Sequence, residues 1–251
     1  MLSLSAYAAL LIGWTGLAAV IFLVLTWVPA PYGRFARAGW GPRLPGNVSW
    51  LVMESPAVLV FTWLFWESSE KTPVSWCFCL LWNVHYTYRS FLYPWVLNRP
   101  HRVPLTVTAS GWCFNVMNGF LQSVYLFHLG PARELSWLTD VRFLAGLTLF
   151  VCGLAIHVRA DSVLRSLRRV HGPGYHVPHG GLFRWISCPN YFGELVEWFG
   201  WAVLTWSWPG LVFFLWSAAN LVPRAAATHR WYRHTFADYP PQRKAVVPFV
   251  L

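Results

Sequence analysis

The feature that most restricts the fold of this chain is a series of long apolar stretches that carry almost no charge. A stretch of about 20 apolar residues crosses the hydrocarbon core of a bilayer as a helix. Charged residues make up only 11% of the 251 residues, and hydrophobic residues make up 56%. A soluble domain carries roughly twice that charged fraction. The sequence therefore predicts an all-α, polytopic integral membrane protein.

Seven apolar segments are expected to form transmembrane helices, and the chain is expected to be a single domain over 1–251. The first segment has no basic residues before it and is long enough to span, so it is not expected to be a cleaved signal peptide. The fifth and seventh are short, so they either begin at the polar edge of the bilayer or carry flanking charges at membrane depth. The segments are Ala6–Val28, Val48–Trp66, Val74–Leu97, Val103–Leu129, Phe143–His157, Tyr191–Trp208 and Pro209–Val222.

Basic residues in the connecting loops predict the orientation of the chain. If seven segments alternate across the membrane, most of the 19 Lys and Arg residues fall on one side. Cytoplasmic loops of membrane proteins carry an excess of Lys and Arg. This asymmetry places the C-terminus in the cytosol and the N-terminus outside. The membrane would be a bacterial inner membrane, or the endoplasmic reticulum if the host is a eukaryote.

Several ionisable side chains lie inside the predicted spans or at their edges. Such groups are costly in lipid and usually face an internal functional site. The alternative is a set of structural ion pairs that join helices. Glu194 and Glu197 are expected to share a face in the first turn of a helix, where the helix dipole favours carboxylates. The set comprises Glu54, His85, Arg89, Glu194 and Glu197.

Polar residues beyond the fifth and seventh segments predict a site for phosphate. Each set has helical spacing, so both segments are expected to continue as helices with a polar stripe. Arg binds phosphate with two parallel hydrogen bonds, and an exposed Tyr can stack on an adenine or nicotinamide ring. The alternative is a purely topological role with attraction to anionic lipid. The two sets are Asp161, Arg165 and Arg168, and Arg224, Thr228 and Tyr232.

Common nucleotide-binding and metal-binding patterns do not occur in the sequence. It has no GxGxxG after a strand and no GxxxxGK[ST], so membrane helices and cytosolic loops would have to hold any nucleotide. No spacing of His and Cys indicates a metal site. For the remaining basic residues a topological role is favoured: Arg34, Arg37, Arg169, Arg243 and Lys244.

Longer motifs carry a resemblance to a known family. They are the sequence Tyr175–Phe183, AsnTyrPheGlyGluLeuValGluTrp at Asn190–Trp198, and AspTyrPro at 238–240 with ArgLysAlaValValProPhe from Arg243. Looser matches are Glu54-Ser-Pro, His85–Arg89, Asn118-Gly and Thr139–Phe143. Together these motifs resemble the steroid 5α-reductase family. The resemblance implies a seven-helix membrane enzyme that uses NADPH to reduce the carbon–carbon double bond of a 3-oxo-4-ene steroid.

The same resemblance implies roles for individual residues. Tyr86 would donate a hydrogen bond to the substrate carbonyl, where negative charge develops during hydride addition. Glu54 would be its partner, either as a protonated donor or as a carboxylate that orients Tyr86. At Thr228 the sequence departs from the family, whose members commonly carry His there. The residues assigned to NADPH, mostly in the C-terminal half 140–251, are Arg89, Asp161, Arg165, Arg168, Tyr175, Asn190, Glu194, Arg224, Thr228 and Tyr232.

Two other functions are compatible with a polytopic chain of this kind. A methyltransferase of the isoprenylcysteine or phospholipid type would bind S-adenosylmethionine, but the Glu54 and Tyr86 pair favours NADPH. A non-enzymatic lipid transporter would show inverted repeats with broken helices, which the sequence does not indicate. The expected partners are a steroid or another lipid enone and the lipid bilayer, with no nucleic acid, no metal and no obligate protein partner.

Overall fold

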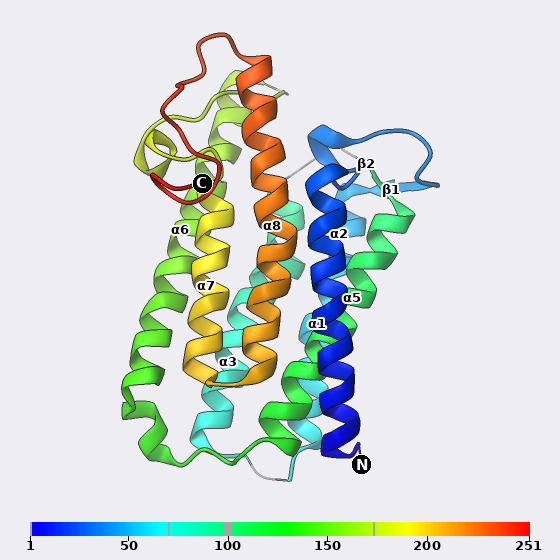
Figure 1. The fold of residues 1–251 in the computed structure, drawn as a ribbon, viewed down its shortest axis with the longest axis vertical. Helices are drawn as coiled ribbons and strands as arrows, with labels where there is room; N and C mark the ends of the chain where they lie inside the picture. The colour runs from blue at the N-terminus through cyan, green and yellow to red at the C-terminus, as the bar shows by residue number, and fades with distance from the viewer. Residues whose placement is uncertain (1, 70, 98–101, 173) are drawn as a thin grey trace. The chain divides into compact units, whose positions relative to one another are not determined.

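The computed structural model describes residues 2–69, 71–97, 102–172 and 174–251, and most of them are helical (Figure 1). Two short strands pair antiparallel, with Leu44 of β1 (Arg43–Pro45) opposite Val103 of β2 (Arg102–Pro104). The helices are α1 (Leu4–Trp27), α2 (Gly46–Glu67), α3 (Pro73–Thr87), α4 (Tyr93–Leu97), α5 (Leu105–Val124), α6 (Val141–His171), α7 (Pro189–Thr205) and α8 (Trp208–Thr235).

The helical character predicted for the seven apolar segments is confirmed. Within the described residues, four helices are long and apolar enough to cross a membrane, namely α1, α2, α6 and α8. The count of seven spans and the orientation remain predictions. The third segment consists of α3, a π-helical turn at Tyr88–Leu92 and α4, and the fourth consists of α5 and a π-helical turn at Tyr125–Leu129.

Helices α6 and α8 are longer than the apolar segments that predicted them. They have 31 and 28 residues, and each continues through the polar stripe that follows its segment. Both expected extensions are therefore confirmed. Each polar stripe belongs to the same continuous helix as the apolar segment before it, so its side chains project from regular helical backbone.

The chain divides into two compact units. Unit 1 comprises Met1–Leu11 and Ala30–Leu144, and unit 2 comprises Ile12–Pro29 and Ala145–Leu251. Helix α1 contributes to both, and the boundary between the units falls near the start of α6. The prediction of a single domain stays a prediction.

In unit 1, α2 packs against α5 and α3. Ser49 of α2 and Thr108 of α5 share a buried hydrogen bond of 2.6 Å between their hydroxyl oxygens. On the other side, the Trp82 indole of α3 donates a hydrogen bond of 2.8 Å to the Ala57 carbonyl of α2. The Trp82 ring also stacks on Phe61, with ring centroids 4.5 Å apart. These contacts fix the register of α2 against both neighbours.

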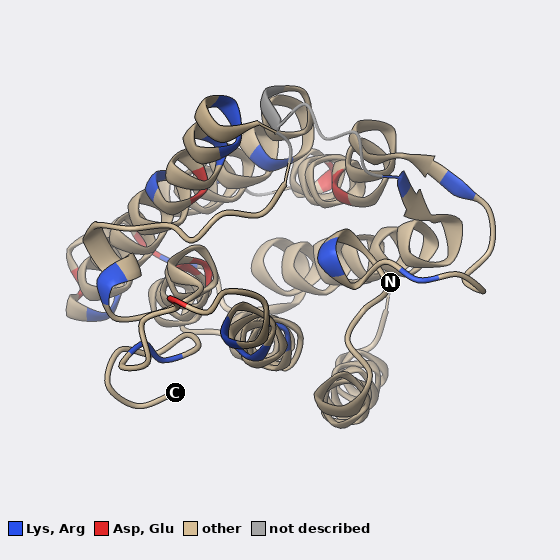
Figure 2. Cartoon of the chain, turned by 90° about the horizontal axis from the view of Figure 1, so that it is seen from above, with Lys and Arg blue, Asp and Glu red and all other residues tan. Residues whose placement is uncertain are grey.

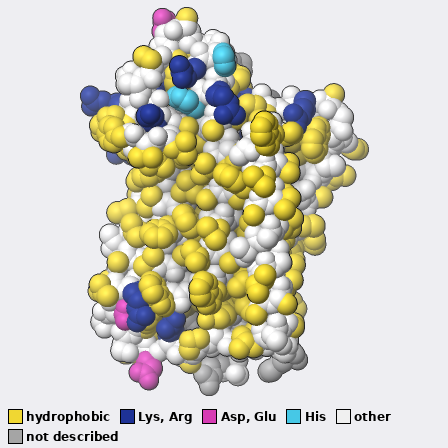
Figure 3. All heavy atoms as spheres, in the orientation of Figure 1, with side chains coloured by type: hydrophobic (Ala, Val, Ile, Leu, Met, Phe, Trp, Pro, Cys, Tyr) yellow, Lys and Arg dark blue, Asp and Glu magenta, His cyan; other side chains and the backbone are white. Residues whose placement is uncertain are grey.

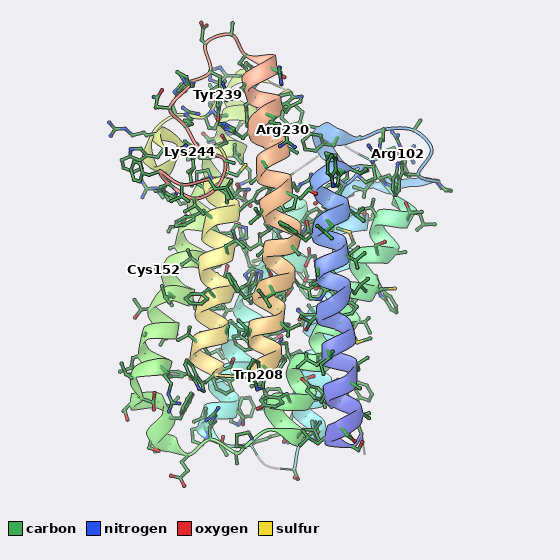
Figure 4. All side chains as sticks on the ribbon, viewed as in Figure 1. Arg102, Cys152, Trp208, Arg230, Tyr239 and Lys244 are labelled. Carbon is green, nitrogen blue, oxygen red and sulfur yellow. The ribbon has the colours of Figure 1, made fainter. Side chains whose placement is uncertain are left out.

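In unit 2, α6, α7 and α8 run alongside one another (Figure 1). Trp198 of α7 packs on Phe213 of α8, with ring centroids 4.4 Å apart. The C-terminal tail folds back on the segment before α7, because the Ser187 N–H donates to the Lys244 carbonyl at 2.8 Å. Figure 4 shows Tyr239 and Lys244 in this tail, and Trp208 and Arg230 at opposite ends of α8.

Charged side chains of unit 2 gather at the end of the helices where the tail lies. In Figure 3, hydrophobic side chains cover the middle of these helices, and Lys, Arg and His appear near the tail. Lys and Arg occur on α6, on α8 and in the tail, and Figure 2 shows basic residues on several helices and in the stretch that leads to the C-terminus. This distribution agrees with the basic cluster expected next to the apolar segments.

Candidate functional site

Two contacts join α2, which carries Glu54, to α3 and the turn that follows it, and Tyr86 lies on α3. The first is the Trp82 hydrogen bond to Ala57 described above, one helical turn from each residue. The second is the Arg89 Nε, which lies 4.0 Å from Glu54 Oε1. Tyr86 falls between these two contacts on α3 and is 3% exposed. Glu54 thus contacts Arg89 from the third segment, and the pairing of Glu54 with Tyr86 stays a prediction.

A π-helical turn positions Arg89. The turn covers Tyr88–Leu92, and such turns insert one extra residue into an α-helix, often at functional sites. The Arg89 guanidinium lies over the rings of Trp50 and Tyr93, at 5.0 and 4.9 Å from their centroids. Two aromatic faces and one carboxylate thus surround this cation. Arg89 belongs to unit 1, whereas the other residues assigned to NADPH belong to unit 2.

Asn115 of α5 is a site residue that the sequence interpretation missed. Its side-chain amide donates to the Met53 carbonyl at 2.8 Å and to Glu54 Oε2 at 3.5 Å. Asn115 is 4% exposed. Its place in an apolar segment was the available signal, since an amide buried in a membrane helix needs a polar partner. Arg89 and Asn115 therefore both present N–H groups to the Glu54 carboxyl.

On α6 of unit 2, the predicted face of Asp161, Arg165 and Arg168 is helical. Asp161 is 3% exposed, and both arginines are half-buried. The Asn190 amide, in the first turn of α7, donates a hydrogen bond of 3.1 Å to Asp161 Oδ1. Two of the residues assigned to the cofactor are thus in direct contact.

The predicted stripe on α8 is also helical, but its tyrosine is not exposed. Tyr232 is 2% exposed, and its ring stacks on Tyr239 at 5.2 Å between centroids and 10° between planes. The expectation of an exposed Tyr that stacks on a nucleotide ring is therefore wrong for Tyr232, because the tail covers it. Thr228 is buried, and the Arg224 Nε donates to the Tyr191 hydroxyl at 3.1 Å.

Tyr175 lies in the loop between α6 and α7. It is half-buried, and its ring meets Trp231 of α8 edge to face at 5.1 Å. This contact ties the loop to the polar end of α8.

The placement of Glu194 and Glu197 corrects one expectation. Helix α7 begins at Pro189, with no acidic residue in its first turn, so these residues occupy later turns. Asn190, which is uncharged, lies in the first turn instead. Glu194 is half-buried, and Glu197 is 0% exposed with its Oε2 3.7 Å from the His157 Nδ1. His157 was missed, although its spacing of four from Asp161 indicated a shared face.

The comparisons with known proteins point to the same family as the sequence motifs. A family model described as 3-oxo-5-alpha-steroid 4-dehydrogenase matches residues 101–251. Steroid 5-alpha-reductase DET2 of Gossypium hirsutum is 44% identical over 235 residues, which cover 91% of each chain. The 3-oxo-5-alpha-steroid 4-dehydrogenase 1 of Bos taurus is 37% identical over 242 residues, which cover 94% of this chain and 93% of the relative.

A human relative, 3-oxo-5-alpha-steroid 4-dehydrogenase 1, is 36% identical over 222 residues, which cover 87% of this chain and 85% of the relative. These similarities extend over almost the whole length of each protein. They favour the reductase over the methyltransferase and the transporter. The chain belongs to the 3-oxo-5-alpha-steroid 4-dehydrogenase family of oxidoreductases.

Proposed function

We propose that this membrane protein reduces the 4,5 carbon–carbon double bond of a 3-oxo-4-ene steroid, or of a similar lipid enone, with NADPH as the reductant. The observation that supports the proposal is that Tyr86 lies between Trp82 and Arg89 in the chain, and that these two residues contact Ala57 and Glu54 of α2. The names of the relatives support the substrate class, because one is a steroid 5-alpha-reductase and another is a 3-oxo-5-alpha-steroid 4-dehydrogenase. The apolar character of the helices suits a substrate that arrives from lipid.

The donors of unit 2 fit a phosphate-bearing dinucleotide. Arg165, Arg168 and Arg224 supply guanidinium groups, which match phosphate oxygens in geometry and charge. Asp161 and Asn190 supply the mixture of acceptor and donor that ribose or an amide requires. When bound, NADPH supplies the hydride, so the chain needs no nucleophile of its own.

Tyr86 is the proposed hydrogen-bond donor to the carbonyl oxygen of the substrate. Hydride addition to the far carbon of the enone places negative charge on that oxygen, and a donor aimed there stabilises the charge. A proton from water then adds to the neighbouring carbon, so that hydride and proton together saturate the double bond. The Glu54 carboxyl faces N–H groups of Arg89 and Asn115, an arrangement that suits an ionised carboxylate. Glu54 is therefore proposed to orient Tyr86 rather than to donate a proton.

The direct test is turnover of testosterone or progesterone by purified protein with NADPH. Loss of nicotinamide absorbance and appearance of the saturated 3-oxo steroid are the expected results. Tyr86→Phe should lower kcat on the order of a hundredfold, as for loss of an oxyanion-hole donor, with little change in NADPH binding. Tyr125→Phe, which removes the hydroxyl of a half-buried tyrosine in the same unit, is the matched control. A wild-type rate in Tyr86→Phe would place the carbonyl site elsewhere.

Glu54→Gln separates the two roles of this carboxyl. Gln can donate a hydrogen bond but cannot carry a negative charge. If Glu54 acts as a carboxylate, the variant should lose most of its turnover and retain its fold. Substantial remaining activity would show instead that a neutral, donating side chain suffices.

A further inference from the structure

A buried histidine in unit 2 has no role in the chemistry proposed above. His157 lies on α6 and is 1% exposed. Its Nε2 is 3.5 Å from Asp161 Oδ2, and its Nδ1 is 3.7 Å from Glu197 Oε2. Asp161 is 3% exposed and Glu197 is 0% exposed. Three ionisable side chains thus meet in the contact between α6 and α7.

Glycines fix the backbone around this cluster. Gly153 lies one turn before His157, and Gly193 lies one turn before Glu197. A Cβ atom added to Gly153 would meet the Gly193 carbonyl oxygen at 2.6 Å, which real contacts essentially never show. The two helix backbones therefore touch at this point. Because the backbones pack this closely, the imidazole lies next to both carboxylates.

The position of the two ring nitrogens favours the protonated, imidazolium form of His157. A neutral imidazole carries a proton on one nitrogen only and presents a lone pair from the other. Here each nitrogen faces a carboxylate oxygen. In a neutral ring, the nitrogen without a proton would point its lone pair at a negatively charged oxygen, which is repulsive. A buried carboxylate also needs a cation or hydrogen bonds to offset its lost hydration. An imidazolium supplies a positive charge next to both the Asp161 and the Glu197 carboxylate.

Asp161 connects this buried cluster to the cofactor residues. Its Oδ2 faces His157, while its Oδ1 accepts the hydrogen bond from the Asn190 amide. Asn190 is half-buried in the first turn of α7. Since the amide nitrogen is bound to Asp161, the amide oxygen of Asn190 is held in one direction. The orientation of Asn190 thus depends on the position of the Asp161 carboxylate.

We propose that His157 is a positioning residue for the cofactor site: its imidazolium holds the Asp161 carboxylate, which orients the Asn190 amide for NADPH. The inference rests on the proposed function, in which Asp161 and Asn190 bind that cofactor. Glu197 serves as the second counter-charge, and it anchors the imidazolium from α7. His157 acts through Asp161 and does not itself touch substrate or cofactor.

The first test is His157→Gln in the full chain, which keeps hydrogen-bonding capacity and removes the charge. Titration of NADPH, followed by nicotinamide fluorescence, gives its Kd, and steady-state turnover gives its KM and kcat. Both Kd and KM should rise about tenfold or more, as for loss of a charged hydrogen-bond partner, while kcat changes less. The control is Ser217→Ala on α8, whose buried hydroxyl bonds to its own helix at Phe213. Its NADPH binding should not change.

A double-mutant cycle with Asp161→Asn separates positioning from a merely structural role. If His157 acts through Asp161, adding His157→Gln to Asp161→Asn should weaken NADPH binding little further. Equal weakening in both backgrounds would overturn the inference. Should His157→Gln fail to fold, the double variant with Glu197→Gln removes a second buried charge and should fold with weakened binding. Wild-type affinity in that protein would equally overturn it.

The same titration separates this inference from the proposed function. Wild-type protein that does not bind NADPH overturns the proposed cofactor, and the inference with it. Wild-type protein that binds NADPH, together with a His157→Gln variant of unchanged Kd, overturns only the role of His157. If His157→Gln weakens NADPH binding in the wild-type background but not in the Asp161→Asn background, both the proposed cofactor and the role of His157 are supported.

Discussion

The arginine side chains on α6 differ in how far they are buried. This difference distinguishes arginines that could bind an anion from arginines that only set the orientation in the membrane. Arg168 is half-buried on the face of Asp161, whereas Arg169 is exposed. Arg224 of α8 is also half-buried and contacts Tyr191. An exposed arginine next to an apolar segment satisfies the positive-inside rule without a ligand. A partly buried one gains from a bound anion.

Arg168→Ala or Arg224→Ala should therefore raise the KM for NADPH and leave the KM for the steroid nearly unchanged. Loss of one charged phosphate contact costs about 1.5–3 kcal/mol, which is roughly a tenfold to hundredfold change. Arg169→Ala is the matched control and should leave NADPH kinetics unchanged. Unaltered NADPH kinetics in both Arg168→Ala and Arg224→Ala would assign these residues to topology.

At the scale of elements, the contact between α6 and α7 depends on glycines spaced by seven residues on each helix. Gly146 and Gly153 of α6 face Gly200 and Gly193 of α7, and an added Cβ would meet backbone atoms in every case. Small residues of this kind let membrane helices approach closely and pack without side-chain ridges.

Gly153→Ala should destabilise unit 2, because the new Cβ meets backbone that cannot move aside. Overpacking of this kind typically costs about 1–3 kcal/mol. The control is Gly16→Ala on α1, where nothing lies within 4 Å of the added atom. Unfolding temperature in detergent should fall for Gly153→Ala and not for Gly16→Ala. Equal stability of the two variants would contradict a close contact between the backbones.

The start of α6 offers a test of pH dependence outside the apolar segments. Asp140 accepts hydrogen bonds from the side chain and the backbone N–H of Arg142, and these bonds lower its pKa from 3.8 to about 2. A carboxyl whose pKa is lower in the folded state stabilises the fold above its unfolded pKa. That contribution is lost as the pH falls from about 4 through about 2.

Asp140→Asn keeps a capping oxygen but removes this charge. The wild type should be more stable than the variant between pH 7 and about pH 5, and the difference should shrink below about pH 4. Thermal unfolding across this pH range measures it. A difference that grows on acidification would contradict the proposed direction of the pKa change.

At the scale of the whole molecule, the distribution of basic residues predicts the orientation of the chain in the membrane. The basic loops predict a cytosolic C-terminus, because cytoplasmic loops of membrane proteins carry an excess of Lys and Arg. A reporter fused after Leu251 should therefore be cytosolic, and one fused before Met1 should lie on the other side. Two reporters on the same side would contradict an odd number of spans.

The sequence by itself determined the helices and their polar stripes, because hydropathy and helical spacing are local properties. The stripe from Asp161 to Arg168 follows from residues within one or two turns. Glu194 and Glu197 were misplaced because Pro189 starts α7 earlier than its apolar residues indicate. The bounds of an amphipathic helix are set by capping and by proline as well as by hydropathy.

Only the tertiary structure decided the contacts that build the site. The burial of Tyr232 depends on a tail that returns from beyond the end of α8, and the environment of Glu54 depends on Arg89 and Asn115 from two other helices. His157 meets Glu197 because glycines on two separate helices bring their backbones together. These contacts join residues far apart in the chain, so no local pattern records them. Their geometry exists only once the helices have packed.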